Sequence, residues 1–230
     1  MTREIFFFLL FYTFPLCAQT IEKIILVEPE NGKITNNKPL FKILVEGDDI
    51  SPSTKYRIEL SRDDFETVEQ TFEQISEKRG WSIHEYENEK GAIYRAQKPL
   101  PDGVYQWRAS VYDGISYIDG KQTSSFIVDS IPPVEVTGLD LEFDPTTGFT
   151  HLRWDSVFLD ANGNSEQVDH YNIYRYEKRS FFFVIRVFYI GSTETTSFID
   201  KDVNKNIPGK VIYYKVVAVD KAGNELGRKY

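Results

Sequence analysis

Three histidines, His84, His151 and His170, are the side chains best suited to acid–base chemistry near neutral pH. His151 and His170 alternate with apolar neighbours at the period of a β-strand, so we expect their rings to face solvent. The sequence contains no G-x-S-x-G, H-E-x-x-H, P-loop or dinucleotide-binding glycine motif. We therefore expect neither a zinc site nor a catalytic triad, and a protein that is not an enzyme and needs no cofactor.

Oxygen-bearing side chains occupy alternate positions of residues 160–166, a spacing that suits Ca²⁺. An EF-hand loop has glycine at its sixth position and glutamate at its twelfth, whereas here Gly163 is fourth and Tyr171 twelfth. The segment predicts an ordinary loop between two strands, without a metal.

Cys17 is the only cysteine, so disulfides cannot stabilise the folded chain. Cys17 directly follows an apolar run over residues 5–16. This run is too short to span a bilayer and has the layout of a secretory signal. We expect a signal peptide over residues 1–18, an exported mature protein (periplasmic, cell-surface or secreted), and no transmembrane helix in that mature chain. The alternative is a lipoprotein lipidated at Cys17, although Phe14 and Leu16 depart from the usual lipobox.

The formal net charge is −8, and much of it lies in residues 63–90, where nine acids and three bases give a local balance of −6. Nucleic acid is a poor partner for such a surface. We expect the acidic stretch to be a solvated loop or sheet edge.

Apolar residues recur with a period of two between turn-forming residues, which predicts an all-β chain. We expect strands in the first half at 24–28, 40–46, 56–61, 93–96, 104–112 and 123–128. In the second half we expect them at 136–142, 149–154, 169–176, 182–189, 197–199, 210–219 and from 224 onward. Between 61 and 94, Phe65, Val68, Phe72 and Ile75 have a spacing that fits either a short helix or a bulged strand.

The clearest boundary is Asp129-Ser130-Ile131-Pro132-Pro133, because two prolines fix φ and remove two hydrogen-bond donors. We expect one domain over 22–129, a stiff linker over 130–133 and a second domain over 134–230.

Similar strands close the two halves, since residues 107–114 (WRASVYDG) align with 214–221 (YKVVAVDK). The second half resembles bacterial fibronectin type III and related Ig-like modules at Trp154, at 171–175 (YNIYR) and at 213–224 (YYKVVAVDKAGN). The first half resembles them at 39–41 (PLF) and 100–108 (LPDGVYQWR). The resemblance implies two tandem seven-stranded β-sandwiches serving adhesion, spacing or recognition. It also implies a tyrosine at the corner before the sixth strand, a place that Tyr105 takes in the first module and Ile212 in the second, whose corner we expect packing to hold.

Residues 181–190 (FFFVIRVFYI) are apolar on both faces of the predicted strand, apart from Arg186. The neighbouring module, a protein partner or another copy of the chain must cover the second face. We therefore expect a partner-binding strand edge, whose residues are Phe182, Val184, Arg186, Phe188 and Tyr189.

We thus expect an exported interaction or adhesion protein of the cell envelope. One alternative is a carbohydrate-binding accessory module, for which Trp81, Tyr86 and Tyr94 could offer flat rings. The other is a structural spacer without a ligand of its own.

Overall fold

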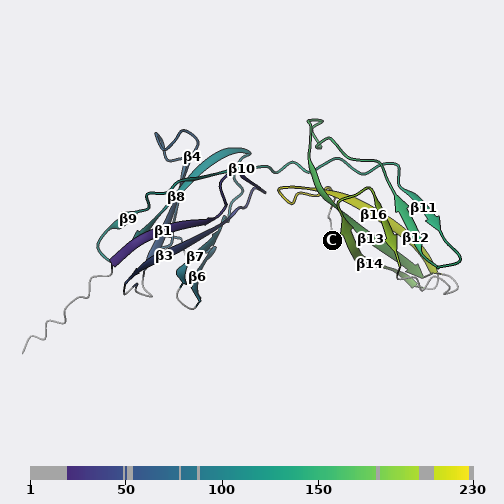
Figure 1. The fold of residues 1–230 in the computed structure, drawn as a ribbon, viewed down its shortest axis with the longest axis horizontal. Coiled ribbons are helices and arrows are strands. Elements are labelled where there is room, and N and C mark those ends of the chain that lie inside the picture. Colours follow the sequence, from purple (N-terminus) through teal and green to yellow (C-terminus); the bar gives the residue numbers. More distant parts are fainter. Residues whose placement is uncertain are drawn as a thin grey trace, which may run out of the picture.

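The computed structural model describes residues 20–48, 50, 54–77, 79–86, 89–179, 182–201 and 210–227, and every helix or strand element among them is a β-strand. Two lobes, each with its own hydrophobic core, follow one another along the long axis and are joined by an extended connection (Figure 1). Among these residues, no helix is long and apolar enough to cross a membrane. The predicted signal peptide and Cys17 lie outside the described residues.

The first half contains two sheets, in which all strand pairs but one are antiparallel. One sheet has, in spatial order, β1 (Thr20–Glu28), β3 (Leu40–Asp48), β7 (Glu89–Arg95) and β6 (Trp81–Tyr86). The other has β2 (Lys33–Thr35), β10 (Ser124–Val128), β8 (Gly103–Tyr112), β4 (Lys55–Ser61) and β5 (Gln70–Glu73), with β9 (Tyr117–Asp119) beside β8. The parallel pair is β2 with β10.

An aromatic core joins these two sheets. Along β8, Tyr105, Trp107 and Val111 are buried because successive side chains of a strand point to opposite faces. From the other sheet Phe41 packs edge-on against Trp107, with ring centroids 5.2 Å apart. Because aromatic side chains bury large apolar areas, this cluster can stabilise a chain that has no disulfide.

The helix that Phe65, Val68, Phe72 and Ile75 could have formed is absent from the described part of residues 61–94. Strands β5 and β6 form instead, each at the edge of its sheet. Phe72 explains why a strand forms here instead of a helix: the residue pairs with Ile58 of β4, and its side chain packs against the core.

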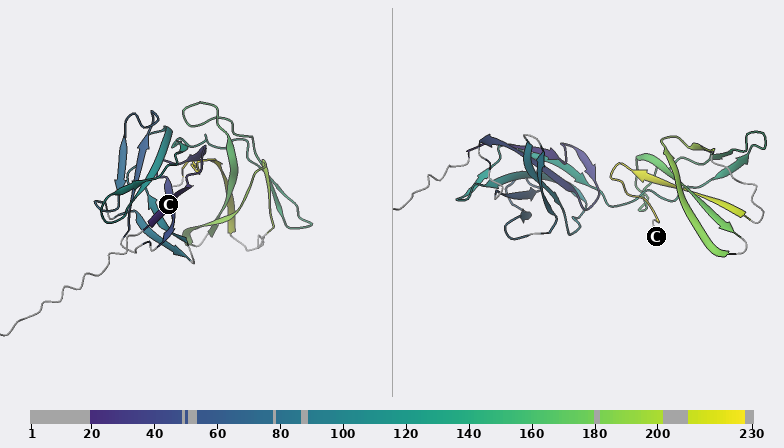
Figure 2. Two further views of the ribbon diagram at one scale, coloured as in Figure 1. Left: turned by 60° about the vertical axis from the view of Figure 1, so that its left-hand side comes forward. Right: turned by 90° about the horizontal axis from the view of Figure 1, so that it is seen from below.

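The second half also contains two sheets, but their strands differ in length. The short sheet has β11 (Asp140–Phe143), β12 (Thr150–Arg153) and β15 (Ser197–Asp200), in that order. The long sheet has β14 (Phe182–Thr193), β13 (Val168–Arg179) and β16 (Lys210–Asp220), in that order. Since four-residue strands face strands of eleven or twelve, the long sheet extends past its partner, as the green strands show in the right-hand view of Figure 2.

Two predicted strands of the second half are wrong in part. The first begins at Asp140 rather than at 136, because Gly138 has a φ of +65° and turns the chain beside the carboxylate of Asp155. The strand expected from Asn224 is reduced, in the described residues, to one bridge between Val219 and Glu225.

A tyrosine hydroxyl closes the corner before the last long strand of the first half. Tyr105 donates to the carbonyl oxygen of Pro101 at 2.9 Å, in agreement with the corner expected in the first half. In the second half packing was expected to suffice because Ile212 takes the usual place. Residues 202–209 of that corner lie outside the described residues, so this expectation stays a prediction. Tyr214, two residues beyond Ile212, donates to Oδ2 of Asp200 on β15 at 2.7 Å.

Candidate functional site

The outer face of the long sheet in the second half is rich in tyrosine and β-branched residues. Strand register aligns three rows across β14, β13 and β16 on this face, namely Tyr189–Tyr174–Lys215, Val187–Tyr176–Tyr213 and Ile185–Lys178–Val211. The inner face carries Ile173, which is fully buried in the core, so the three rows point away from the sandwich. Neither sheet of the second half covers this face.

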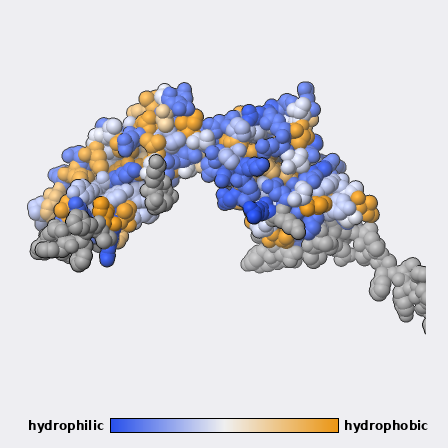
Figure 3. All heavy atoms as spheres, turned by 180° about the vertical axis from the view of Figure 1, so that it is seen from behind, coloured by the Kyte–Doolittle hydropathy of each residue, from blue (hydrophilic) through white to orange (hydrophobic). Residues whose placement is uncertain are grey.

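Large apolar side chains on this face are open to solvent. Ile185, Val187 and Tyr189 on β14 are 54%, 53% and 58% exposed, and Tyr213 on β16 is 53% exposed. Tyr174, on the middle strand, is only 9% exposed, and its ring lies 5.7 Å from the ring of exposed Tyr189. Figure 3 shows hydrophobic residues in orange gathered over the second half, on the left in that view.

The partner-binding residues expected from the sequence lie on β14, but they divide between its two faces. Tyr189 belongs to the outer face, while Phe188 lies opposite Arg175 and Arg186 opposite Glu177 on the inner face. Phe182 and Val184 are part of β14, and their side chains lie outside the described residues.

The inner face under β14 holds a buried charged cluster. Nη1 of Arg175, which is 6% exposed, donates to both carboxylate oxygens of Asp200 on β15, at 3.1 and 2.9 Å. Lys210 and Arg175 each contact Oε1 of Glu177, at 2.9 and 3.1 Å. Burial, followed by the hydrogen bond to Asp200, raises the pKa of Tyr214 well above its usual value, so this hydroxyl stays protonated. The cluster therefore ties β15 to the long sheet by charge where the apolar core has ended.

A hollow of about 400 Å³ opens beside this cluster, between the edges of β14 and β15. Phe188 and Phe198 line it together with Arg175 and Asp200. The guanidinium of Arg175 lies 5.6 Å from the ring centre of Phe188. The inner side of the β14 edge is thus open as well as its outer side.

Two loops of the second half share a D-x-x-G-N motif and one geometry. In residues 160–164, Asp160 accepts hydrogen bonds from the backbone N and from Nδ2 of Asn164, at 2.8 and 3.0 Å. In residues 220–224, Asp220 accepts the same two bonds from Asn224, both at 2.9 Å. The residues tested for an EF-hand are therefore a self-closed turn, as the sequence predicted. That residues 220–224 form the same turn was not predicted from the sequence, although the D-x-x-G-N motif is repeated there.

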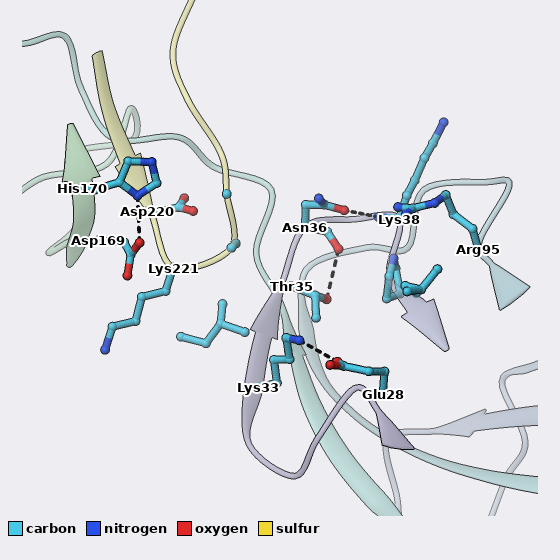
Figure 4. Close-up of a pocket in the computed structure, with 15 residues that line it drawn as sticks. Glu28, Lys33, Thr35, Asn36, Lys38, Arg95, Asp169, His170, Asp220 and Lys221 are labelled. Atoms are coloured by element: carbon cyan, nitrogen blue, oxygen red, sulfur yellow. Dashed lines mark hydrogen bonds and ion pairs between the residues drawn. The ribbon is translucent and has the colours of Figure 1, made fainter. Parts of the chain in front are cut away.

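The second of these turns contacts the end of the first half. Nδ2 of Asn224 donates to the carbonyl oxygen of Asp129 at 2.9 Å, next to the two prolines of the linker. Figure 4 shows the polar pocket beside this contact, with Lys33, Lys38 and Arg95 on one side and His170, Asp220 and Lys221 on the other. The pocket measures about 370 Å³. Its lining is polar and aliphatic, with His170 as its one aromatic ring.

Three carboxylates meet at the same junction. The oxygens of Asp129, Glu166 and Asp220 lie within 4.8 Å of one another. Burial raises the pKa of Glu166, and the negative charges of Asp220 and Asp129 raise it further. Such a group could hold a divalent cation, but acidic clusters also occur without one, and no other feature of the described residues indicates a ligand here.

Among the side chains that the structure describes, the histidines are not brought together, and the aromatic rings considered as sugar platforms do not form an exposed platform. His151 on β12 and His170 on β13 are half-buried and lie in different sheets, and the side chain of His84 is outside the described residues. Tyr94 is fully buried and packs against half-buried Trp81 with the rings tilted by 37° and their centroids 4.6 Å apart, so both rings belong to the core and its margin. The side chain of Tyr86 lies outside the described residues.

Comparison with known proteins relates this chain to others by fold alone. No family model and no curated protein matches it. Among solved structures it is similar to the FN1–FN3 domains of chicken CNTN1, with a TM-score of 0.51 and 12% identity over 90% of this chain and 64% of that one. A marsupial T cell receptor (TM-score 0.30, 11% identity, 89% of this chain and 58% of that one) and a chimeric titin Z1Z2 (0.32, 12%, 86% and 90%) are more distant. The chain is an all-β protein whose fold is similar to that of fibronectin type III sandwiches.

Proposed function

We propose that this chain is an exported interaction protein, in which β14 and the outer face beside it bind a protein partner. The observation that carries the proposal is the open outer face, where Tyr189, Val187 and Tyr213 are each more than half exposed. Soluble proteins rarely leave large contiguous apolar patches uncovered, and tyrosine is enriched in the centres of protein interfaces. Sandwiches of this kind are common as cell-surface domains.

The remainder of the proposal follows the sequence. A signal peptide over residues 1–18 would deliver the chain to the periplasm, the cell surface or the medium, with lipidation of Cys17 as the route to anchoring. We assign residues 22–129 and 134–230 to two domains and residues 130–133 to their linker.

A spacer role is the second candidate, and the contact between Asn224 and Asp129 favours it. Together with the two prolines, this hydrogen bond restricts how the halves can turn about the linker. The two roles are compatible, because a fixed junction would hold the outer face of the second half at a constant angle.

Site-specific photo-crosslinking in the producing cells tests the proposal. A benzoylphenylalanine residue at position 213, on the outer face, should yield an adduct with a protein, identified by mass spectrometry. The matched control is position 115 in the first half, where Ile115 is 82% exposed and lies far from the long sheet. Adducts at neither position, or equal adducts at both, would contradict a binding face on the long sheet.

A further inference from the structure

Strand β14 offers a free edge as well as an exposed face. Among the described residues it pairs with β13 on one side and with no strand on the other. Its 12 residues leave a long row of backbone donors and acceptors along that edge. Native edge strands are usually short, charged or covered, whereas Arg186 is the one charge on β14.

We infer that β14 of one copy pairs antiparallel with β14 of a second copy, about a two-fold axis at Val187. The inference rests on the proposed function in one respect, that β14 is the interaction strand. The product is a continuous sheet of six strands, whose outer face joins the exposed surfaces of both copies.

Strand geometry limits where the axis can lie. A two-fold axis perpendicular to the sheet leaves the outer faces of both copies on the same side. The residue at the axis must then pair with the same residue of the second copy. An axis at Arg186 would oppose two guanidinium groups. An axis at Val187 places Arg186 opposite Phe188 of the second copy on the inner face, where a cation–π contact can form. On the outer face it places Ile185 opposite Tyr189, and both are exposed in the single chain.

The hollow on the inner side fits the same register. Phe188 lines it, so a guanidinium brought opposite this ring lies at the mouth of an open space rather than against packed core. Arg186, the one charge on β14, therefore does not oppose edge pairing in this arrangement.

The size of the contact predicts a weak dimer. A strand of 12 residues is about 40 Å long and a sheet about 10 Å thick, so edge pairing covers roughly 400 Å² on each copy. Stable interfaces cover about 800 Å² on each partner. We expect self-association at concentrations on the order of 10–100 µM. Because each copy has a net charge of −8, added salt should strengthen the dimer, whereas it would weaken binding of an acidic partner to Arg186.

Sedimentation velocity of the purified protein over a concentration series tests the inference. We expect a monomer–dimer equilibrium for the wild type. V187K and V187E each place like charges opposite each other at the axis and should be monomeric at the same concentrations. An equimolar mixture of V187K and V187E should recover the dimer, because the two opposed charges are then of opposite sign.

V211K is the matched control, since Val211 is a half-exposed valine on the outer face of the same sheet but on β16. It should sediment like the wild type, and circular dichroism should show that all variants are folded. A wild type that remains monomeric, a V187K dimer, or a mixture that does not associate would each overturn the inference. A monomeric wild type with an adduct to another protein at position 213 would leave the proposed function standing, and loss of both results would remove both.

Discussion

Asn224, in the turn that follows β16, donates from Nδ2 to the carbonyl oxygen of Asp129, 2.9 Å away at the end of the first half. The same amide also donates to Oδ2 of Asp220 at 2.9 Å, so one side chain closes its own turn and joins the two halves. A short polar turn thereby restricts the orientation of the two halves at their junction.

N224A should loosen the junction, because it removes both hydrogen bonds that Nδ2 donates, one to Asp129 and one to Asp220. We expect the stability of the second half to fall by about 1 kcal/mol and the distance distribution from small-angle X-ray scattering to broaden. N164A is the matched control, since it removes the equivalent Nδ2 bond to Asp160 and no bond to Asp129. Equal broadening in both variants would show that Asn224 does not set the orientation.

D200A should be the most destabilising of these changes, because it removes the carboxylate that both the buried guanidinium of Arg175 and the hydroxyl of Tyr214 bond, and leaves Arg175 its contact with Glu177. Breaking a buried ion pair in this way costs about 3 kcal/mol. Hydrogen exchange of peptides from β15 and β16 should show the loss. D140A on the exposed strand β11 should change little, and the double variant R175M/D200L should recover most of the loss if charge burial is its cause.

Y105F should lower the stability of the first half by about 1 kcal/mol, because the buried Tyr105 loses the hydroxyl that donates to the carbonyl oxygen of Pro101. Urea denaturation followed by the fluorescence of buried Trp107 measures the effect. Y112F serves as the control, since Tyr112 donates to Gly114 from an exposed turn, and a loss as large as that of Y105F would contradict a special role for the corner.

Mild acid should stabilise the junction. The pKa of Glu166 is raised in the folded state, first by burial and then by neighbouring acids, so its ionised form is disfavoured there. As the pH falls from 7 toward that raised pKa, the folded state takes up the proton first and gains stability. E166Q should therefore be slightly more stable at pH 7, by a few tenths of a kcal/mol, and should show a smaller gain on acidification.

Thermal unfolding of E166Q at several pH values, with E142Q on exposed β11 as the control, checks this prediction. Below about pH 4 the trend should reverse, because hydrogen bonds from Asn164 lower the pKa of Asp160 and its protonation then destabilises the fold. A slope of the same size in E166Q and the wild type would mean that Glu166 is not the group responsible.

Local pattern determined much of the fold in advance. Period-two alternation is a property of neighbouring residues, so it located β3, β4, β8 and β10 to within two residues at either end. The two prolines between Asp129 and Val134 likewise restrict φ through their own rings, independently of the rest of the fold. The helix considered around Phe72 failed because its ring packs against a core built largely from other parts of the chain.

The sequence by itself determined an all-β chain and the apolar strand that the structure shows as β14, while the stiff linker over residues 130–133 stays a prediction. Period-two alternation already puts Arg186 and Tyr189, three residues apart, on opposite faces of β14. Only the tertiary structure decided which face is which, because Arg186 lies opposite Glu177 on the inner face and Tyr189 opposite Tyr174 on the outer face. It also decided that Asp200 meets Arg175 and that Asn224 meets Asp129. These contacts join residues 25 and 95 positions apart, and such pairings depend on how sheets and turns pack rather than on the residues beside them.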